Sequence, residues 1–351
     1  MEETPYTCRQ TLKTSAPISC LAEGSSDHFF AGSDDGSVRV YNQETLKVVK
    51  AIRGLGEVSS VVCMSHNAGG LGDMWVASNR HALHFAMDTE KMILEKADAT
   101  LTLELASSRS TKKNNQLAFC LDSGTIGVVD LSTKQVSRMK TSHDNICGTV
   151  KFIPDRPSEL VSGGYDSKLL HHDFHQKTVL SRFDLGMSPL SESSGVSMSP
   201  PFILSSAMSP SGILAAGTAD GRVWIGPGGE KMSGVSSGTS IKKKRRKWEG
   251  LKQDEAFTAD VGHGPITALT FIGPRTLFTS TLMGKVTLHE IGSPTADGKL
   301  DISPKWMRET TDVNKVNAII AIGGLIIIGG LSERGGGMIE VWEKGLKSGD
   351  V

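Results

Sequence analysis

The chain has 351 residues, in which 38 lysines and arginines balance 38 aspartates and glutamates. A nucleic-acid-binding domain usually carries an excess of basic residues, so this balance argues against a chain devoted to nucleic acid. The 39 glycines, together with short apolar runs, indicate many tight turns and hence β-structure. The five cysteines form no CxxC pair, which argues against a disulfide framework and favours a reducing compartment.

Nothing in the sequence predicts a membrane segment. The polar start MEETPYTCRQ lacks the apolar core of a signal peptide. The most apolar stretch, IIAIGGLIIIGG (319–330), is shorter than the roughly 20 residues that a membrane-spanning helix takes. Its paired glycines favour a strand, a turn and a second strand.

A short pattern returns along the chain: small residues, a turn, and then an alternating apolar strand, as in FAGSDDGSVRVYN (30–42). The first four repeats keep a period of about 44 residues, and the later ones carry insertions. We call the first apolar residue of each such strand its anchor. The anchors are Val38, Leu83, Ile126, Leu169, Val223, Val286 and Ile339.

Each anchor strand is flanked by further β-like runs. In the first unit, ISCL (18–21) and FFAGS precede it and TLKVVKAI (45–52) follows it; in the second unit, KMILEK (91–96) is the run expected to follow. Four strands in each repeat of roughly 40–45 residues predict the blades of a β-propeller. We expect seven blades, at about 16–54, 55–99, 100–142, 143–185, 200–262, 263–312 and 313–345.

The last of these blades lacks a fourth strand after VWEK, and the run 6–15 at the start of the chain has no partner of its own. Pairing the two removes two open sheet edges, which would otherwise favour aggregation. We therefore predict an all-β, seven-bladed propeller that the N-terminal strand closes by joining the last blade.

The units resemble WD repeats in two features. A histidine precedes the inner strand in SHDNICGTV and in GHGPITAL, and the terminal dipeptide survives as Val129-Asp130, His172-Asp173 and Trp342-Glu343. The segment 144–174 is similar to the WD repeat-containing protein 53 family. The resemblance implies a buried hydrogen-bond network, to which we assign His143, Ser162, Asp166, Asp220 and His263.

Three insertions interrupt the repeat. The first, 186–201, is either a linker or a substrate for proline-directed kinases at Ser188-Pro189 and Ser199-Pro200. The second is a flexible insertion at 227–256, and the third, 292–304, is a longer surface loop. The second holds a basic run that is interpreted as a nuclear import signal, with a solvated loop or a nucleic-acid contact as alternatives. The run consists of Lys242, Lys243, Lys244, Arg245, Arg246 and Lys247.

Trp248 follows the basic run, and it either stacks on a base or covers a blade. No GxSxG elbow, Walker-type phosphate loop or HExxH motif occurs in the chain. The histidines of HALH (81–84) and HHDFH (171–175) are interpreted as packing or surface residues. We therefore expect a protein that is not an enzyme, with no cofactor, metal or small-molecule substrate.

These observations favour a rigid scaffold or adaptor for protein or peptide partners in the nucleus, the cytoplasm or both. The residues just before the innermost strands should line the partner-binding rim, namely Pro17, Glu57, Asn145, Pro265 and Lys315. One alternative is a substrate receptor of a cullin-RING ubiquitin ligase, with 342–345 or 172–175 as a box that lacks its last basic residue. The other is a nuclear assembly factor for ribosome biogenesis or chromatin that uses the basic run as an arm.

Overall fold

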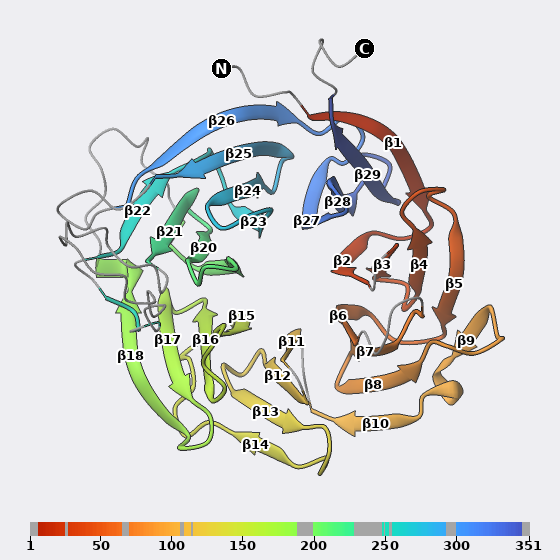
Figure 1. The fold of residues 1–351 in the computed structure, drawn as a ribbon, viewed down its shortest axis with the longest axis horizontal. Helices are drawn as coiled ribbons and strands as arrows, with labels where there is room; N and C mark the ends of the chain where they lie inside the picture. Colours follow the sequence, from red (N-terminus) through yellow and green to blue (C-terminus); the bar gives the residue numbers. More distant parts are fainter. Residues whose placement is uncertain are drawn as a thin grey trace, which may run out of the picture.

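The computed structural model describes residues 6–24, 27–64, 70–105, 109–113, 115–187, 199–227, 248, 250–252, 255–292 and 300–345. Its strands form seven sheets that stand side by side around a ring, as Figure 1 shows. The predicted fold class, an all-β propeller with seven blades, is confirmed. Within the described ranges, no helix is both long and apolar enough to cross a membrane.

Blades 1 to 4 follow one another along the chain, each running from an innermost to an outermost strand. Blade 1 contains β2 (Ile18–Glu23), β3 (His28–Ser33), β4 (Val38–Asn42) and β5 (Val48–Arg53). Blade 2 contains β6 (Val58–Met64), β7 (Asp73–Ser78), β8 (His81–Ala86) and β10 (Leu101–Glu104). Blade 3 contains β11 (Arg109–Lys113), β12 (Gln116–Cys120), β13 (Ile126–Asp130) and β14 (Val136–Arg138). Blade 4 contains β15 (Cys147–Phe152), β16 (Glu159–Gly164), β17 (Lys168–Asp173) and β18 (Thr178–Asp184).

Blades 5 to 7 complete the ring, and all seven anchors lie in third strands. Blade 5 contains β19 (Ile203–Met208), β20 (Leu214–Thr218), β21 (Arg222–Gly226) and β22 (Phe257–Asp260). Blade 6 contains β23 (Ile266–Phe271), β24 (Thr276–Thr281), β25 (Lys285–Ile291) and β26 (Ile302–Glu309). Blade 7 contains β27 (Lys315–Ile322), β28 (Leu325–Leu331), β29 (Gly337–Lys344) and β1 (Tyr6–Thr14). Two single turns of 3₁₀ helix lie at Lys96–Asp98 and Leu185–Met187.

The ring closes through β1, as predicted. This strand pairs antiparallel with β29 from Tyr6 opposite Lys344 to Thr14 opposite Gly337, with a bulge between Cys8 and Gln10. The start of the chain and its last strand therefore lie side by side in one blade (Figure 1). The pairing covers the outer edge of β29, which would otherwise expose unpaired backbone groups.

Blade 2 differs from the expectation in its outer strand. The run KMILEK supplies β9 (Ile93–Glu95), which pairs parallel with β5 of blade 1 instead of completing blade 2. Leu94 is buried against blade 1, and the ammonium of Lys50 donates to the carbonyl oxygens of Met87 at 2.7 Å and Thr89 at 2.6 Å. These contacts hold the segment on blade 1, so blade 2 ends at Glu104 and the predicted boundary at 99/100 falls too early.

The apolar core is divided among the junctions between blades. Buried side chains of the described residues form seven clusters, and each of them joins two neighbouring blades. The cluster between blades 6 and 7 includes Tyr6 of β1, whose ring meets that of Phe278 edge to face at 5.1 Å. Because each blade packs against two others, removing one strand disturbs two junctions.

One face of the ring, here called the upper face, is formed by the turns between second and third strands and by the connections between blades. The two kinds of loop are tied together: the amide of Leu55 donates to the carbonyl of Gly36 at 3.2 Å, and that of Thr310 donates to Gly284 at 2.9 Å. Gly36 has a φ of 75°, and a Cβ there would lie 2.0 Å from the Leu55 oxygen. The upper face is therefore held by backbone contacts that leave its side chains free to face outward.

Candidate functional site

The five predicted rim residues all lie on the upper face, at the start of the innermost strands of five blades. Pro17, Glu57, Asn145 and Pro265 precede β2, β6, β15 and β23, and Lys315 begins β27. Their side chains differ in exposure: Glu57, Asn145 and Lys315 are exposed, whereas the two prolines are half-buried.

Backbone hydrogen bonds fix three of these rim positions. The carbonyl of Pro17 accepts from the amide of Asp34 at 3.1 Å, that of Glu57 from Asn79 at 3.2 Å, and that of Pro265 from Leu282 at 2.8 Å. In each case the donor lies in or beside the turn between the second and third strands of the same blade. The rim therefore presents its side chains from a backbone that needs little ordering when a partner binds.

The buried network of blade 4 joins three of the residues assigned to it. His143 Nδ1 lies 2.9 Å from Asp166 Oδ1, and His143 Nε2 lies 2.9 Å from Ser162 Oγ. Ser162 Oγ in turn lies 3.1 Å from His172 Nε2. Burial opposes ionisation of Asp166, but hydrogen bonds from His143 and from the backbone amides of Asp144 and Lys168 lower the pKa of that carboxyl below its ordinary value.

The carboxylate of Asp166 determines which nitrogen of each histidine carries the hydrogen along this series of hydrogen bonds. Ionised Asp166 accepts from His143 Nδ1–H, so His143 Nε2 carries no hydrogen and accepts from the Ser162 hydroxyl. The oxygen of that hydroxyl in turn accepts from His172 Nε2–H. His172 thus supplies the N–H donor that a tryptophan indole supplies in well-formed WD repeats. Blade 6 uses the same replacement, since His289 Nε2 lies 3.0 Å from Thr279 Oγ1.

Burial keeps both of these histidines neutral. It lowers the pKa of His172 to about 3 and that of His289 to about 4. Each Nδ1 atom is buried without a hydrogen-bond partner among the described residues, as expected for the acceptor nitrogen of a neutral ring.

The other two residues assigned to the buried network, Asp220 and His263, do not belong to the network of blade 4. Asp220 of blade 5 accepts from Thr218 Oγ1 at 2.5 Å and from Arg222 Nε at 2.6 Å, and no histidine joins it among the described residues. The expectation for His263 is wrong, because its side chain is exposed in the connection between β22 and β23. Blade 6 has Met283 where blade 4 has Asp166, so a buried His263 would lack the carboxylate that holds the ring.

The two candidate boxes for a ubiquitin-ligase adaptor begin with residues of the interior. Trp342 is buried, and its indole donates to Glu340 Oε2 at 2.8 Å. His172 is buried in the network of blade 4, and Asp173 Oδ1 accepts the amides of His175 and Gln176 at 2.9 Å each. These side chains are therefore engaged in holding their own blades.

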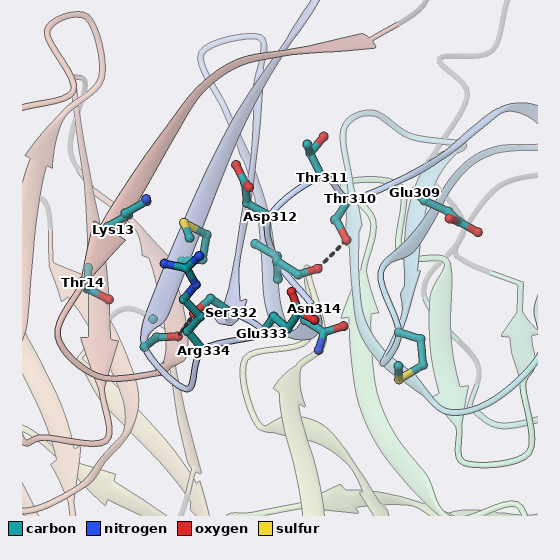
Figure 2. A pocket seen from close by; sticks show the side chains of 15 residues that line it. Lys13, Thr14, Glu309, Thr310, Thr311, Asp312, Asn314, Ser332, Glu333 and Arg334 are labelled. Atoms are coloured by element: carbon teal, nitrogen blue, oxygen red, sulfur yellow. Dashed lines mark hydrogen bonds between the residues drawn. The ribbon is translucent and has the colours of Figure 1, made fainter.

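A groove of about 850 Å³ opens on the upper face where blade 6 meets blade 7. Its floor is the connection from β26 to β27, and its sides include the end of β1 and the turns after β24 and β28. Figure 2 shows Lys13 and Arg334 on one side and Glu309 on the other. Lys13, Glu309 and Arg334 are exposed and make no ion pair with any described residue.

A buried carboxylate positions the floor of this groove. Glu340 is 0% exposed, and its Oε1 accepts the amides of Thr311 at 2.8 Å, Asp312 at 2.6 Å and Val313 at 3.0 Å. Its Oε2 accepts the indole N–H of Trp342. Because the three amides point inward to one oxygen, the side chains of Thr311 and Asp312 remain exposed.

Trp248 covers a blade, which is the second of the two alternatives predicted for it. It is 4% exposed in the cluster between blades 4 and 5, and its ring lies 4.7 Å from that of His171. Its carbonyl accepts from Arg156 Nε at 3.1 Å. The basic run Lys242–Lys247, the Ser188-Pro189 pair and most of the third insertion lie outside the described residues.

Two further histidines make packing contacts within their blades. His171 lies between Glu159, at 2.9 Å, and Ser181, at 3.1 Å, and His84 Nδ1 lies 2.5 Å from Thr100 Oγ1. Among the described residues, no group of three or more His, Cys, Asp or Glu side chains is arranged to hold a metal ion. Burial raises the pKa of Cys20 to about 12, so this thiol stays protonated.

The comparisons with known proteins agree with this architecture. The family model for the WD domain, G-beta repeat, matches residues 6–42, which run from β1 to the end of β4. The crystal structure of the WD40 beta propeller domain of Doa1 matches over 97% of each chain with a TM-score of 0.67 and 11% identity, which supports the fold. The chain therefore has the fold of a seven-bladed β-propeller and is similar to WD repeats over residues 6–42.

The chain is also similar to the WD repeat-containing protein 53 homolog of Dictyostelium discoideum. The two are 26% identical over 172 residues, which are 47% of this chain and 46% of the relative. The predicted resemblance to that family is therefore confirmed, and the chain spans about half the length of the curated relative it matches.

Sequence reasoning missed the groove and its buried carboxylate. One signal was present: Glu340 is the only acidic residue directly after an anchor, in the apolar run MIEVW (338–342). A carboxylate at such a position must find donors, because burying it unpaired is costly. Which loop supplies those donors could not be deduced from the repeat alone.

Proposed function

We propose that this protein is a non-enzymatic scaffold that presents its upper face to protein or peptide partners. The carrying observation is the rim, where exposed Glu57, Asn145 and Lys315 stand at or just before the start of the innermost strands of three blades. A face of this kind binds without a large ordering cost.

Two double variants of equal net charge test this proposal. Glu57→Lys with Lys315→Glu reverses two charges on the rim. Glu44→Lys with Lys177→Glu reverses two exposed charges in the turns between third and fourth strands, at the opposite ends of the blades. Affinity purification with quantitative mass spectrometry should lose partners only with the rim variant, while both variants melt like the wild type. Equal recovery by the two variants would reject the upper face.

A second role, nuclear assembly with Lys242–Lys247 as an import signal, is supported by the six consecutive basic residues of the sequence. Trp248, directly after this run, is buried between blades 4 and 5. Neutralising the six basic residues should move a fluorescent fusion from the nucleus to the cytoplasm. If the run contacts nucleic acid instead, binding to a DNA duplex should fall steeply with salt.

The cullin-RING receptor role draws its support from the resemblance to WD repeats alone. Co-purification of a cullin adaptor with the wild type, and its loss in the rim variant, would favour it over a general scaffold.

A further inference from the structure

The groove between blades 6 and 7 carries exposed charges of both signs, and both of its cations belong to blade 7. Lys13 at the end of β1 and Arg334 in the turn after β28 belong to blade 7. Glu309 at the end of β26 and Met283 in the turn after β24 belong to blade 6. In Figure 2 the two cations lie together on one side, with Glu309 across the floor from them.

Apolar surface lies on the same side as Glu309. Met283 is 61% exposed, which is unusual for a large apolar side chain and leaves its thioether and methyl free for a partner. The side chains of Thr311 and Asn314 on the floor, and of Ser332 in the turn after β28, add hydroxyl and amide groups. These groups match the backbone amides and carbonyls of an extended chain.

Hydrogen bonds fix the backbone of the groove floor, so the floor cannot move to pair with the charges on the two sides. The Glu340 carboxylate holds three consecutive amides of the connection 309–314, and Thr11 Oγ1 donates to Asp312 at 3.0 Å. A ligand therefore meets the charges in fixed places. Electrostatic complementarity at fixed charges determines which partner binds and in which orientation.

The charges also disfavour one class of ligand. The groove carries three carboxylates, Glu309, Asp312 and Glu333, against the two cations Lys13 and Arg334. A nucleic acid, with a phosphate at each nucleotide, would meet net repulsion here.

We propose that this groove binds an extended peptide segment of a partner protein that carries an acidic and a basic side chain with an apolar residue between them. The acidic side chain pairs with Lys13 and Arg334, the apolar one packs on Met283, and the basic one pairs with Glu309. This inference rests on the proposed scaffold function and assigns to it a second site, which adjoins the rim at Lys315, directly after Asn314 of the groove.

A random dodecapeptide display library, selected on the immobilised full-length protein, tests the proposal. Peptides enriched on the wild type should share an acidic and a basic position. On the double variant Lys13→Glu with Arg334→Glu, the enriched acidic position should become basic. A fluorescein-labelled synthetic copy of the wild-type consensus peptide should bind this variant at least tenfold more weakly by anisotropy. It should bind the Glu44→Lys with Lys177→Glu control within twofold of the wild type.

The outcomes separate the groove from the rim. No enrichment, or one consensus shared by the wild type and the groove variant, overturns the groove proposal. If that happens while the rim variant still loses partners, the scaffold function stands without this site. If neither variant loses a ligand, the proposed function fails as well. Lys13 and Arg334 are exposed, so matched melting temperatures of the variants exclude unfolding as the cause.

Discussion

Glu340 offers the sharpest test of how the upper face is built. Replacing it with alanine removes the acceptor of three backbone amides and of the Trp342 indole, and leaves the rest of β29 unchanged. Val313 and Trp342 are buried, so the donors of these two residues cannot find water without local unfolding. Thr311 and Asp312 are exposed, so their amides can be rehydrated.

The expected loss of stability follows from this difference between the buried and the exposed donors. A buried donor left without an acceptor costs roughly 1–3 kcal/mol, and a rehydrated one costs roughly 0.5–1.5 kcal/mol. Two of each kind give a loss of about 6 kcal/mol in the free energy of unfolding for Glu340→Ala. Glu340→Gln keeps one carbonyl acceptor and should cost about half as much. Either value is a large part of the roughly 5–15 kcal/mol that stabilises a typical domain.

Equilibrium urea unfolding, followed by tryptophan fluorescence, measures this loss. The matched control is Glu343→Ala on the same strand, where the carboxylate lies 3.8 Å from Arg9 and the side chains of Arg9 and Glu343 are 38% and 47% exposed. Such a pair contributes roughly 0–1 kcal/mol. Hydrogen exchange at 311–313 should accelerate only in the Glu340 variants. A Glu340→Ala protein within about 1 kcal/mol of the wild type, with these amides still protected, would refute the reasoning.

Three further expectations follow from the fold. Deleting residues 1–15 should lower the melting temperature sharply in differential scanning fluorimetry, because β1 covers an edge of blade 7; unchanged melting would contradict the closure. His172 has a pKa of about 3 in the fold against 6.5 when unfolded, so stability should fall as the pH drops below 6.5, by up to about 1.4 kcal/mol per pH unit. Between pH 6.5 and 5, urea unfolding should therefore show about 2 kcal/mol more loss for the wild type than for His172→Phe, and parallel losses would exclude this residue as the cause. Trp248→Ala should cost about 3–5 kcal/mol in the same assay, whereas an effect below about 1 kcal/mol would place this side chain outside the core.

The repeat made most of the architecture predictable. Each blade is built from neighbouring strands joined by short turns, so its pattern of apolar residues and turn residues lies within one short segment of the sequence. The unpaired run at the start of the chain and the incomplete last blade sufficed to predict the closure through β1. The same local reasoning placed the five rim positions at or just before the start of innermost strands.

Features that depend on contacts between blades were harder to predict from the sequence. The run 91–96 has the pattern of an outer strand, but it pairs with β5 of another blade because Leu94 and Lys50 hold it there. The burial of His263 was inferred by analogy with His143, yet the network needs a carboxylate that blade 6 lacks.

Local periodicity and the count of strands were enough to predict the number of blades, the place of each third strand and the closure of the ring. The groove could be found only from tertiary contacts, since Lys13 on its side and Asp312 on its floor are about 300 residues apart in the chain. The physical reason is that ring closure brings the two ends of the chain together, and no periodic pattern specifies which side chains then meet across a junction between blades.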